Sequence, residues 1–209
     1  MAHRAPVGAT LTRLDDATRE LVRVSAALAA GGEPDVRAAL NVASKIAPHE
    51  WIEELLLQTY LFAGFPRTLN GMREWRRIAP EPAPATLAPV PGDVTRRGED
   101  VCARVYGGMY DRLRHNVADL HPLLDDWMIS EGYGKVLSRP ALDLGRRELC
   151  IVAACAASGQ DRQLQSHLHG ARNVGVPDAV VGATLAALDG VVAAPLLERA
   201  VRLWGRVSA

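Results

Sequence analysis

The chain repeats part of its own sequence at a distance of 128 residues. The segment LDDATRELVRVSAALAAGG, starting at position 14, aligns without a gap with LDLGRRELCIVAACAASGQ, starting at position 142. The identical pairs include Asp15/Asp143, Arg19/Arg147, Glu20/Glu148, Val24/Val152 and Gly31/Gly159, and after one extra residue also Trp75/Trp204. Shared charged residues, glycine and tryptophan are hard to obtain by chance, so we predict two copies of one structural unit.

Both copies follow helical spacing, with apolar residues three and four positions apart and few runs that alternate at period two. This pattern predicts an all-α fold. In the first copy, Asp15 or Asp16 is placed to cap a helix that stops at residues 31–32. In the second copy, Asp143 and Gly159 are placed to frame the corresponding helix.

Two further helices are predicted at the end of the first copy. The segment HEWIEELLLQTYLFAG, residues 49–64, is apolar on most sides after its first turn, which indicates a buried helix. Pro66 suits the first turn of the next helix, which we expect to end near Arg77.

A proline-rich segment divides the chain into two units. Residues 79–92, APEPAPATLAPVPG, contain five prolines and are predicted to form an extended, non-helical linker. The first repeat is therefore assigned to residues 1–78 and the second to residues 93–209. The second unit starts with extra material, which is predicted to form one or two helices and a turn at residues 132–134.

The composition argues against several classes of function. The formal net charge of the 209 residues is +0, so no basic surface suggests binding to nucleic acid or to an anionic membrane. The N-terminus lacks the apolar core of a signal peptide, and no apolar run is long enough to span a membrane. We therefore expect a cytoplasmic protein that binds neither nucleic acid nor membrane.

Cys150 and Cys155 are predicted to be small buried apolar residues rather than a redox pair. Cys150 and Cys155 are five positions apart on a predicted helix, about 140° around its axis and roughly 7.5 Å along it. Side chains placed in this way do not form a disulfide unless the helix unwinds. The chain has no Cys-x-x-Cys pair, the spacing that favours a reactive thiolate, and no partner is indicated for Cys102.

Four segments together resemble the carboxymuconolactone decarboxylase family, an all-α group that includes alkylhydroperoxidase D. The second copy carries RRGEDVCARVYGG, then EGYGKVLSRPALDLGRREL, then DRQLQSHLHGARNVGVP. The first copy carries EELLLQTYLFAGFPRTLNGM. Each motif is loose, but their order and spacing resemble the decarboxylase branch over nearly the whole chain outside the linker and the first dozen residues.

The resemblance implies a helical repeat that assembles into rings. Single-repeat members form trimers or hexamers, so a fused pair is expected to form a homo-oligomer, with a trimer favoured. The resemblance also implies a cofactor-free lyase whose ligand is a small-molecule carboxylic acid or lactone.

By the same resemblance, His167 and Glu54 are the candidate catalytic residues. His167 lies on the inward stripe of its predicted helix, three residues after Leu164 and four before Ala171. A neutral imidazole transfers protons near pH 7, but a core histidine bonded to a carbonyl would have the same spacing. Glu54 lies in an apolar helix, where a carboxylate needs a partner or a raised pKa. The alternative for Glu54 is a solvated carboxylate in the first turn.

The chain departs from the family pattern because it divides these two residues between its copies. Single-repeat relatives carry both in one repeat. The first copy has Glu54 but Ala39 at the histidine position. The second copy has His167 but Gly182 at the glutamate position. Either one composite site forms where the copies meet, or the site typical of the family is lost.

Three more residues are candidates for substrate binding. Arg139 is a candidate clamp for a substrate carboxylate, because a guanidinium binds a carboxylate with two hydrogen bonds. Its alternative is a structural pairing with a helix end. Tyr133 and Tyr60 are candidates to donate a hydroxyl to an enolate oxygen, with simple packing as the alternative. No histidine pair has metal-ligand spacing, so no metal site is predicted.

The sequence leaves three functions open. The first is an acid–base lyase in which His167 and Glu54 handle the proton and Arg139 holds a carboxylate. The second is a thiol peroxidase of the alkylhydroperoxidase D type, which would need a cysteine pair that the chain lacks. The third is a non-catalytic or differently specialised duplicate that serves ligand binding or assembly.

Overall fold

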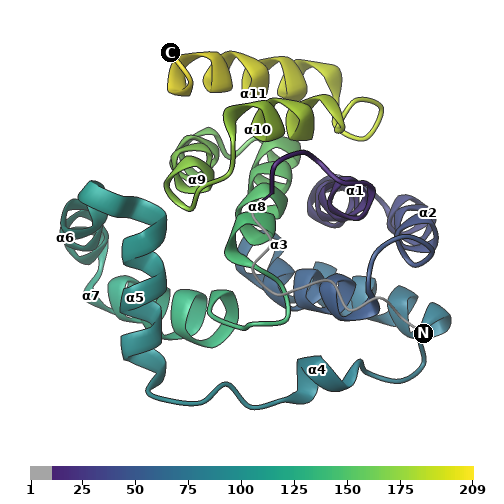
Figure 1. Ribbon diagram of the computed structural model, residues 1–209, viewed down its shortest axis with the longest axis horizontal. Coiled ribbons are helices and arrows are strands. Elements are labelled where there is room, and N and C mark those ends of the chain that lie inside the picture. Colours follow the sequence, from purple (N-terminus) through teal and green to yellow (C-terminus); the bar gives the residue numbers. More distant parts are fainter. Residues whose placement is uncertain (1–10) are drawn as a thin grey trace.

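The computed structural model describes residues 11–209, and in this range it contains helices and no strand (Figure 1). The predicted all-α class is confirmed. Within the same range, no helix is both long enough and apolar enough to cross a membrane.

In chain order, the helices are α1 (Asp16–Ala30), α2 (Glu33–Ala43), α3 (His49–Ile78), α4 (Pro84–Leu87), α5 (Val94–Tyr106), the 3₁₀-helix η1 (Gly107–Met109), α6 (Tyr110–Leu120), α7 (Pro122–Trp127), the π-helix η2 (Met128–Leu137), α8 (Leu144–Ser158), α9 (Asp161–Asn173), α10 (Asp178–Ala186) and α11 (Ala194–Val207).

The helices α1 and α8 begin and end where the repeat predicts. Asp15 caps α1 by accepting the N–H of Thr18 at 2.7 Å, and Asp143 caps α8 by accepting the N–H of Arg146 at 3.0 Å. Each helix has 15 residues. At the end of α8, Gly159 has φ 68°, the left-handed conformation that favours glycine at this position. That the two copies arose by duplication stays a prediction.

The long helix α3 contains the break that the sequence predicts. Gly64 has φ 80° and ψ 162°, a backbone conformation that interrupts the helix and is open mainly to glycine. The helical stretch after the break starts near Pro66, which has no N–H to leave unpaired at a helix start.

The proline-rich linker contains one helical turn, so the prediction that it is non-helical was wrong at α4. Pro84 stands at the first helical position, where the missing N–H of proline costs nothing. The buried carboxylate of Glu53 in α3 holds this turn, because it accepts the hydroxyl of Thr86 at 2.7 Å and the N–H of Ala83 at 3.0 Å. The linker is therefore attached to the first copy.

The predicted turn at residues 132–134 was also wrong, because these residues lie inside η2. Gly134 of η2 and Gly98 of α5 instead allow these two helices to pack closely. A Cβ on Gly134 would lie 2.1 Å from the carbonyl oxygen of Val94, and a Cβ on Gly98 would lie 2.1 Å from that of Ile129. The backbones of α5 and η2 are thus in direct contact, which only glycine permits.

One hydrophobic core runs through both copies. The helix α8 lies at its centre, where it packs against α1, α3, α9, α10 and α11 (Figure 1). The helices α5 and η2 pack against each other and join this core through α9 and α3. Burial of apolar surface in a shared core means that neither copy is completed without the other.

We expect Gly134→Ala to lower the free energy of unfolding by about 1–3 kcal/mol or more, because the added methyl group overlaps the Val94 carbonyl. Gly132→Ala in the same helix is the matched control, since nothing lies within 4 Å of a Cβ there. Urea denaturation of both variants measures the difference. Equal stabilities would contradict the close packing of α5 against η2.

Candidate functional site

A histidine–carboxylate pair joins α8 to α9. Nδ1 of His167 lies 2.8 Å from Oε2 of Glu148. Glu148 is fully buried and His167 is 5% exposed. The second carboxylate oxygen of Glu148, Oε1, is also buried and has no hydrogen-bond partner within residues 11–209. A buried carboxylate needs such contacts, so the pair with His167 is the interaction that keeps Glu148 in this place.

Gly170 makes room for this pair. It lies one turn after His167 in α9, and a Cβ there would lie 2.6 Å from Oε2 of Glu148 and 2.8 Å from Cγ1 of Val105. Any larger residue would push the carboxylate away from the imidazole or separate α9 from α5.

His167 lines a cavity of about 590 Å³ that is rich in aromatic residues. Five of the ten aromatic residues in the chain line it: Tyr60, Phe62, Tyr106, Trp127 and Tyr133. The ring of Phe62 meets the imidazole edge to face, with centroids 5.6 Å apart. The wall is completed mainly by aliphatic side chains and Glu131. Such a lining suits a small, largely apolar molecule.

The tyrosines of this cavity keep their protons at neutral pH. Burial raises the pKa of Tyr106 to about 12 and raises that of Tyr133 well above its ordinary value. The pKa of Tyr60 is also raised, first by burial and then by the charge of Glu131. The structure thus brings three predicted site residues, His167, Tyr133 and Tyr60, to one cavity. Their roles there stay predictions.

Glu54 and Arg139 are bound to each other rather than to this cavity, whose lining includes neither of them. The guanidinium of Arg139 donates to both carboxylate oxygens of Glu54, at 2.8 and 3.0 Å, and to the carbonyl of Thr86 at 2.6 Å. The fully buried Arg147 donates to Glu54 at 2.7 Å and to Gln58 at 3.0 Å. These contacts join α3, the linker and α8, and they give Glu54 and Arg139 a structural role.

Glu54 and His167 thus belong to two separate pairs, although the sequence had left a composite site of both residues open as one alternative. Glu54 faces two arginines, and His167 faces Glu148. Sequence reasoning missed Glu148, although the Glu20/Glu148 match in the repeat was a signal for it. A second signal was its place just before the apolar run LCIVAAC, where an acid has to find a buried partner.

The first copy has a counterpart of this site without the histidine. Glu20 and Ala39, at the repeat positions of Glu148 and His167, both line a separate cavity of about 290 Å³. Glu20 pairs with Arg19 at 3.1 Å and lies 3.9 Å from Arg23. Within residues 11–209 the partners of Glu20 are arginines and include no histidine, so the histidine–carboxylate pair described above belongs to the second copy.

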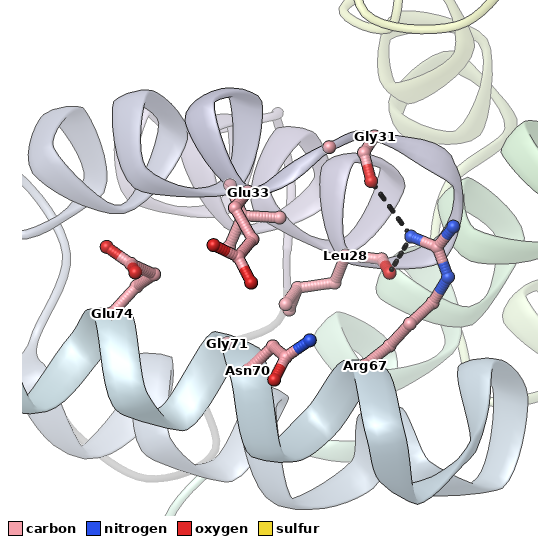
Figure 2. Close-up of a pocket in the computed structure, with 9 residues that line it drawn as sticks. Leu28, Gly31, Glu33, Arg67, Asn70, Gly71 and Glu74 are labelled. Carbon is pink, nitrogen blue, oxygen red and sulfur yellow. Dashed lines mark hydrogen bonds between the residues drawn. The ribbon is translucent and has the colours of Figure 1, made fainter.

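Another cavity, of about 280 Å³, lies between α1, α2 and α3 and is shown in Figure 2. Arg67 points across it and donates to the carbonyls of Leu28 at 3.2 Å and Gly31 at 2.9 Å, which are free acceptors at the end of α1. Glu74 at the other end is held by Arg37 and Arg77. Arg67 thus bonds the end of α1, and Glu74 pairs with two arginines. We therefore assign the charged groups of this cavity a structural role.

The three cysteines are free and buried, which the sequence predicted for Cys150 and Cys155. Burial raises the pKa of Cys102, Cys150 and Cys155 to about 12 in each case. A thiol of this kind forms almost no thiolate at neutral pH and is a poor nucleophile.

We expect native protein at pH 8 to resist alkylation by iodoacetamide at all three cysteines, because the thiols are buried and protonated. After unfolding in guanidinium chloride, each chain should take up three labels, as counted by mass spectrometry. Rapid labelling of the native chain would contradict the buried positions and would reopen the thiol peroxidase alternative.

We expect Glu54→Gln to destabilise the fold by about 3–5 kcal/mol, because it leaves the buried charge of Arg147 without its partner. Glu198→Gln is the matched control, since Glu198 pairs with Arg202 on the surface and such a pair contributes about 0–1 kcal/mol. Denaturant unfolding measures both. A mild effect of Glu54→Gln, similar to that of the control, would contradict the structural role of Glu54.

Two comparisons with known proteins found similar sequences. Residues 124–205 match the model of the carboxymuconolactone decarboxylase family, and this stretch holds both Glu148 and His167. A protein of Schizosaccharomyces pombe named Peroxisomal protein 2 is 31% identical over 128 residues, which cover 59% of this chain and 60% of that protein. The match to the family model over residues 124–205 confirms the resemblance seen in the sequence.

Proposed function

We propose that this chain is an acid–base enzyme that moves a proton to or from carbon in a small, largely apolar ring compound of the lactone type. The observation that carries this proposal is the His167–Glu148 pair at the wall of an aromatic cavity. The family match supports it, because the matched stretch contains both residues.

His167 is suited to be the proton carrier. Glu148 holds one ring nitrogen, Nδ1, so the other nitrogen, Nε2, is left for a molecule in the cavity. A buried carboxylate in this position orients the ring and stabilises the imidazolium that forms when the ring takes up a proton. In the proposal His167 is the general acid or base and Glu148 positions it.

The reaction of a carboxylated lactone follows from these groups. The C–C bond to the carboxylate breaks, carbon dioxide leaves, and the electron pair passes to the lactone carbonyl as an enolate. His167, protonated from solvent, then delivers its proton to carbon, and the carbonyl re-forms. Tyr133 and Tyr60 line the same cavity and keep their protons, so they can donate hydrogen bonds to the enolate oxygen.

This proposal changes the roles that the sequence suggested for Glu54 and Arg139. Both are used by the contacts between α3, the linker and α8, so neither holds the substrate. The trimeric assembly and the cytoplasmic location expected from the sequence stay predictions, and the relative in Schizosaccharomyces pombe is named as a peroxisomal protein.

A specialised duplicate that binds a ligand without turnover is the second candidate. The loss of the histidine from the first copy favours it, because one of the two related cavities has already lost its acid–base pair. Such a protein would show a rise in Tm with a lactone but no chemical change of that lactone.

The test uses two lactones in D₂O, 4-carboxymuconolactone and α-angelica lactone, which lacks the carboxylate. Proton NMR follows deuterium entry and loss of the carboxylate. We expect turnover of at least one lactone, a loss of about 100-fold or more in His167→Ala, and about tenfold or more in Glu148→Gln.

His115→Ala is the matched control, because His115 is a largely exposed histidine in α6 outside the cavity. It should keep the wild-type rate. If neither lactone reacts, or if His167→Ala reacts as fast as the wild type, the acid–base proposal is wrong.

A further inference from the structure

A second and larger hollow lies next to the aromatic cavity. It is a cleft of about 610 Å³ between α9 on one side and α5, η1 and α6 on the other. Its polar lining includes Arg112, Asn116, Arg162, Gln165, Ser166 and His169. No aspartate or glutamate is among the residues that line it. The charge of this cleft is therefore positive.

The two guanidinium groups of this cleft are not used by the fold. Within residues 11–209, the guanidinium groups of Arg112 and Arg162 make no ion pair and no hydrogen bond. By contrast, Arg114 in α6 pairs with Asp125, and Arg199 in α11 pairs with Asp161. Both arginines are exposed and line the same cleft, so their N–H donors are free to bind an anion there.

The side chains of α9 explain how one helix serves two sites. Arg162, Gln165 and His169 recur at three- and four-residue spacing and form one polar stripe that faces the cleft. His167 points to another face and reaches the aromatic cavity. The same helix thus supplies the acid–base group to one hollow and the anion donors to the next.

Tyr106 lines both hollows. In the cavity its ring meets that of Tyr133 edge to face, with centroids 6.3 Å apart. One molecule that lies across Tyr106 would place an apolar end beside His167 and a charged end in the cleft. The aromatic cavity itself offers no arginine or lysine for a charged group.

We propose that the cleft binds an anionic group, of the phosphate or polycarboxylate class, at the remote end of the molecule whose apolar end lies at His167. This inference rests on the proposed function for the identity of the reacting end. The substrate is then an amphipathic molecule, a small ring or acyl part that carries a multiply charged anion. Arg112 and Arg162 bind the anion through charge-assisted, two-pronged hydrogen bonds.

Isothermal titration of the whole chain with sodium pyrophosphate, and separately with citrate, tests the cleft without any turnover. We expect binding of at least one of them in 25 mM salt, with weaker binding in 150 mM salt because salt screens the charges. The double variant Arg112→Gln/Arg162→Gln should bind at least tenfold more weakly. Which of the two anions binds tells phosphate from carboxylate chemistry.

Arg73→Gln is the matched control, an exposed arginine of α3 outside the cleft that makes no ion pair in the described part of the chain. It should bind as the wild type does. If neither anion binds, or if the double variant binds as tightly as Arg73→Gln, the inference is wrong.

The outcome is separate from that of the lactone experiment. His167→Ala should leave anion binding unchanged, since His167 does not line the cleft. Anion binding without lactone turnover would support the anion site and contradict the acid–base proposal. Lactone turnover without anion binding would contradict the anion site alone.

Discussion

The fold depends on three consecutive charged residues that α8 carries into the core. Arg146 bonds the N-terminal end of α1 through its side-chain donors. Arg147 bonds Glu54 in α3. Glu148 bonds His167 in α9. A buried charge without a partner costs several kcal/mol, so each contact fixes one neighbouring helix against α8. The element that holds the two copies together is therefore also the element that positions the His167–Glu148 pair.

The two copies contribute different residues to the cavity and to the buried ion pairs of one shared core. The second copy keeps the imidazole, its carboxylate and most of the walls of the aromatic cavity. The first copy contributes Tyr60 and Phe62 to those walls and supplies Glu54, which pairs with arginines that the second copy contributes. The extra helices at the start of the second unit then add a cleft of positive charge beside the cavity. A cavity assembled from several helices in this way changes its shape when any one of them shifts.

Local patterns in the sequence were enough to predict most of the helices. Apolar spacing, the caps at Asp15 and Asp143 and the break at Gly64 all act within a few residues, and the structure agrees with each. The errors arose where distant contacts overrule local preference. The one-turn helix α4 is held by Glu53 from α3, and Gly134 of η2 serves contact with α5 rather than a turn. Composition alone does not reveal such partners.

The sequence by itself determined the all-α class, the resemblance of the second half to the carboxymuconolactone decarboxylase family and the inward face of α9 that carries His167, because periodicity and motif order are local properties of the chain. Only the tertiary structure decided which buried charges meet. Glu54 and Glu148 both lie in apolar helices, and each needed a cation or a donor. The packing of α3 and α9 against different faces of α8 gave the arginines to Glu54 and the imidazole to Glu148. Spacing along a helix tells which face a side chain occupies but not which helix packs against that face.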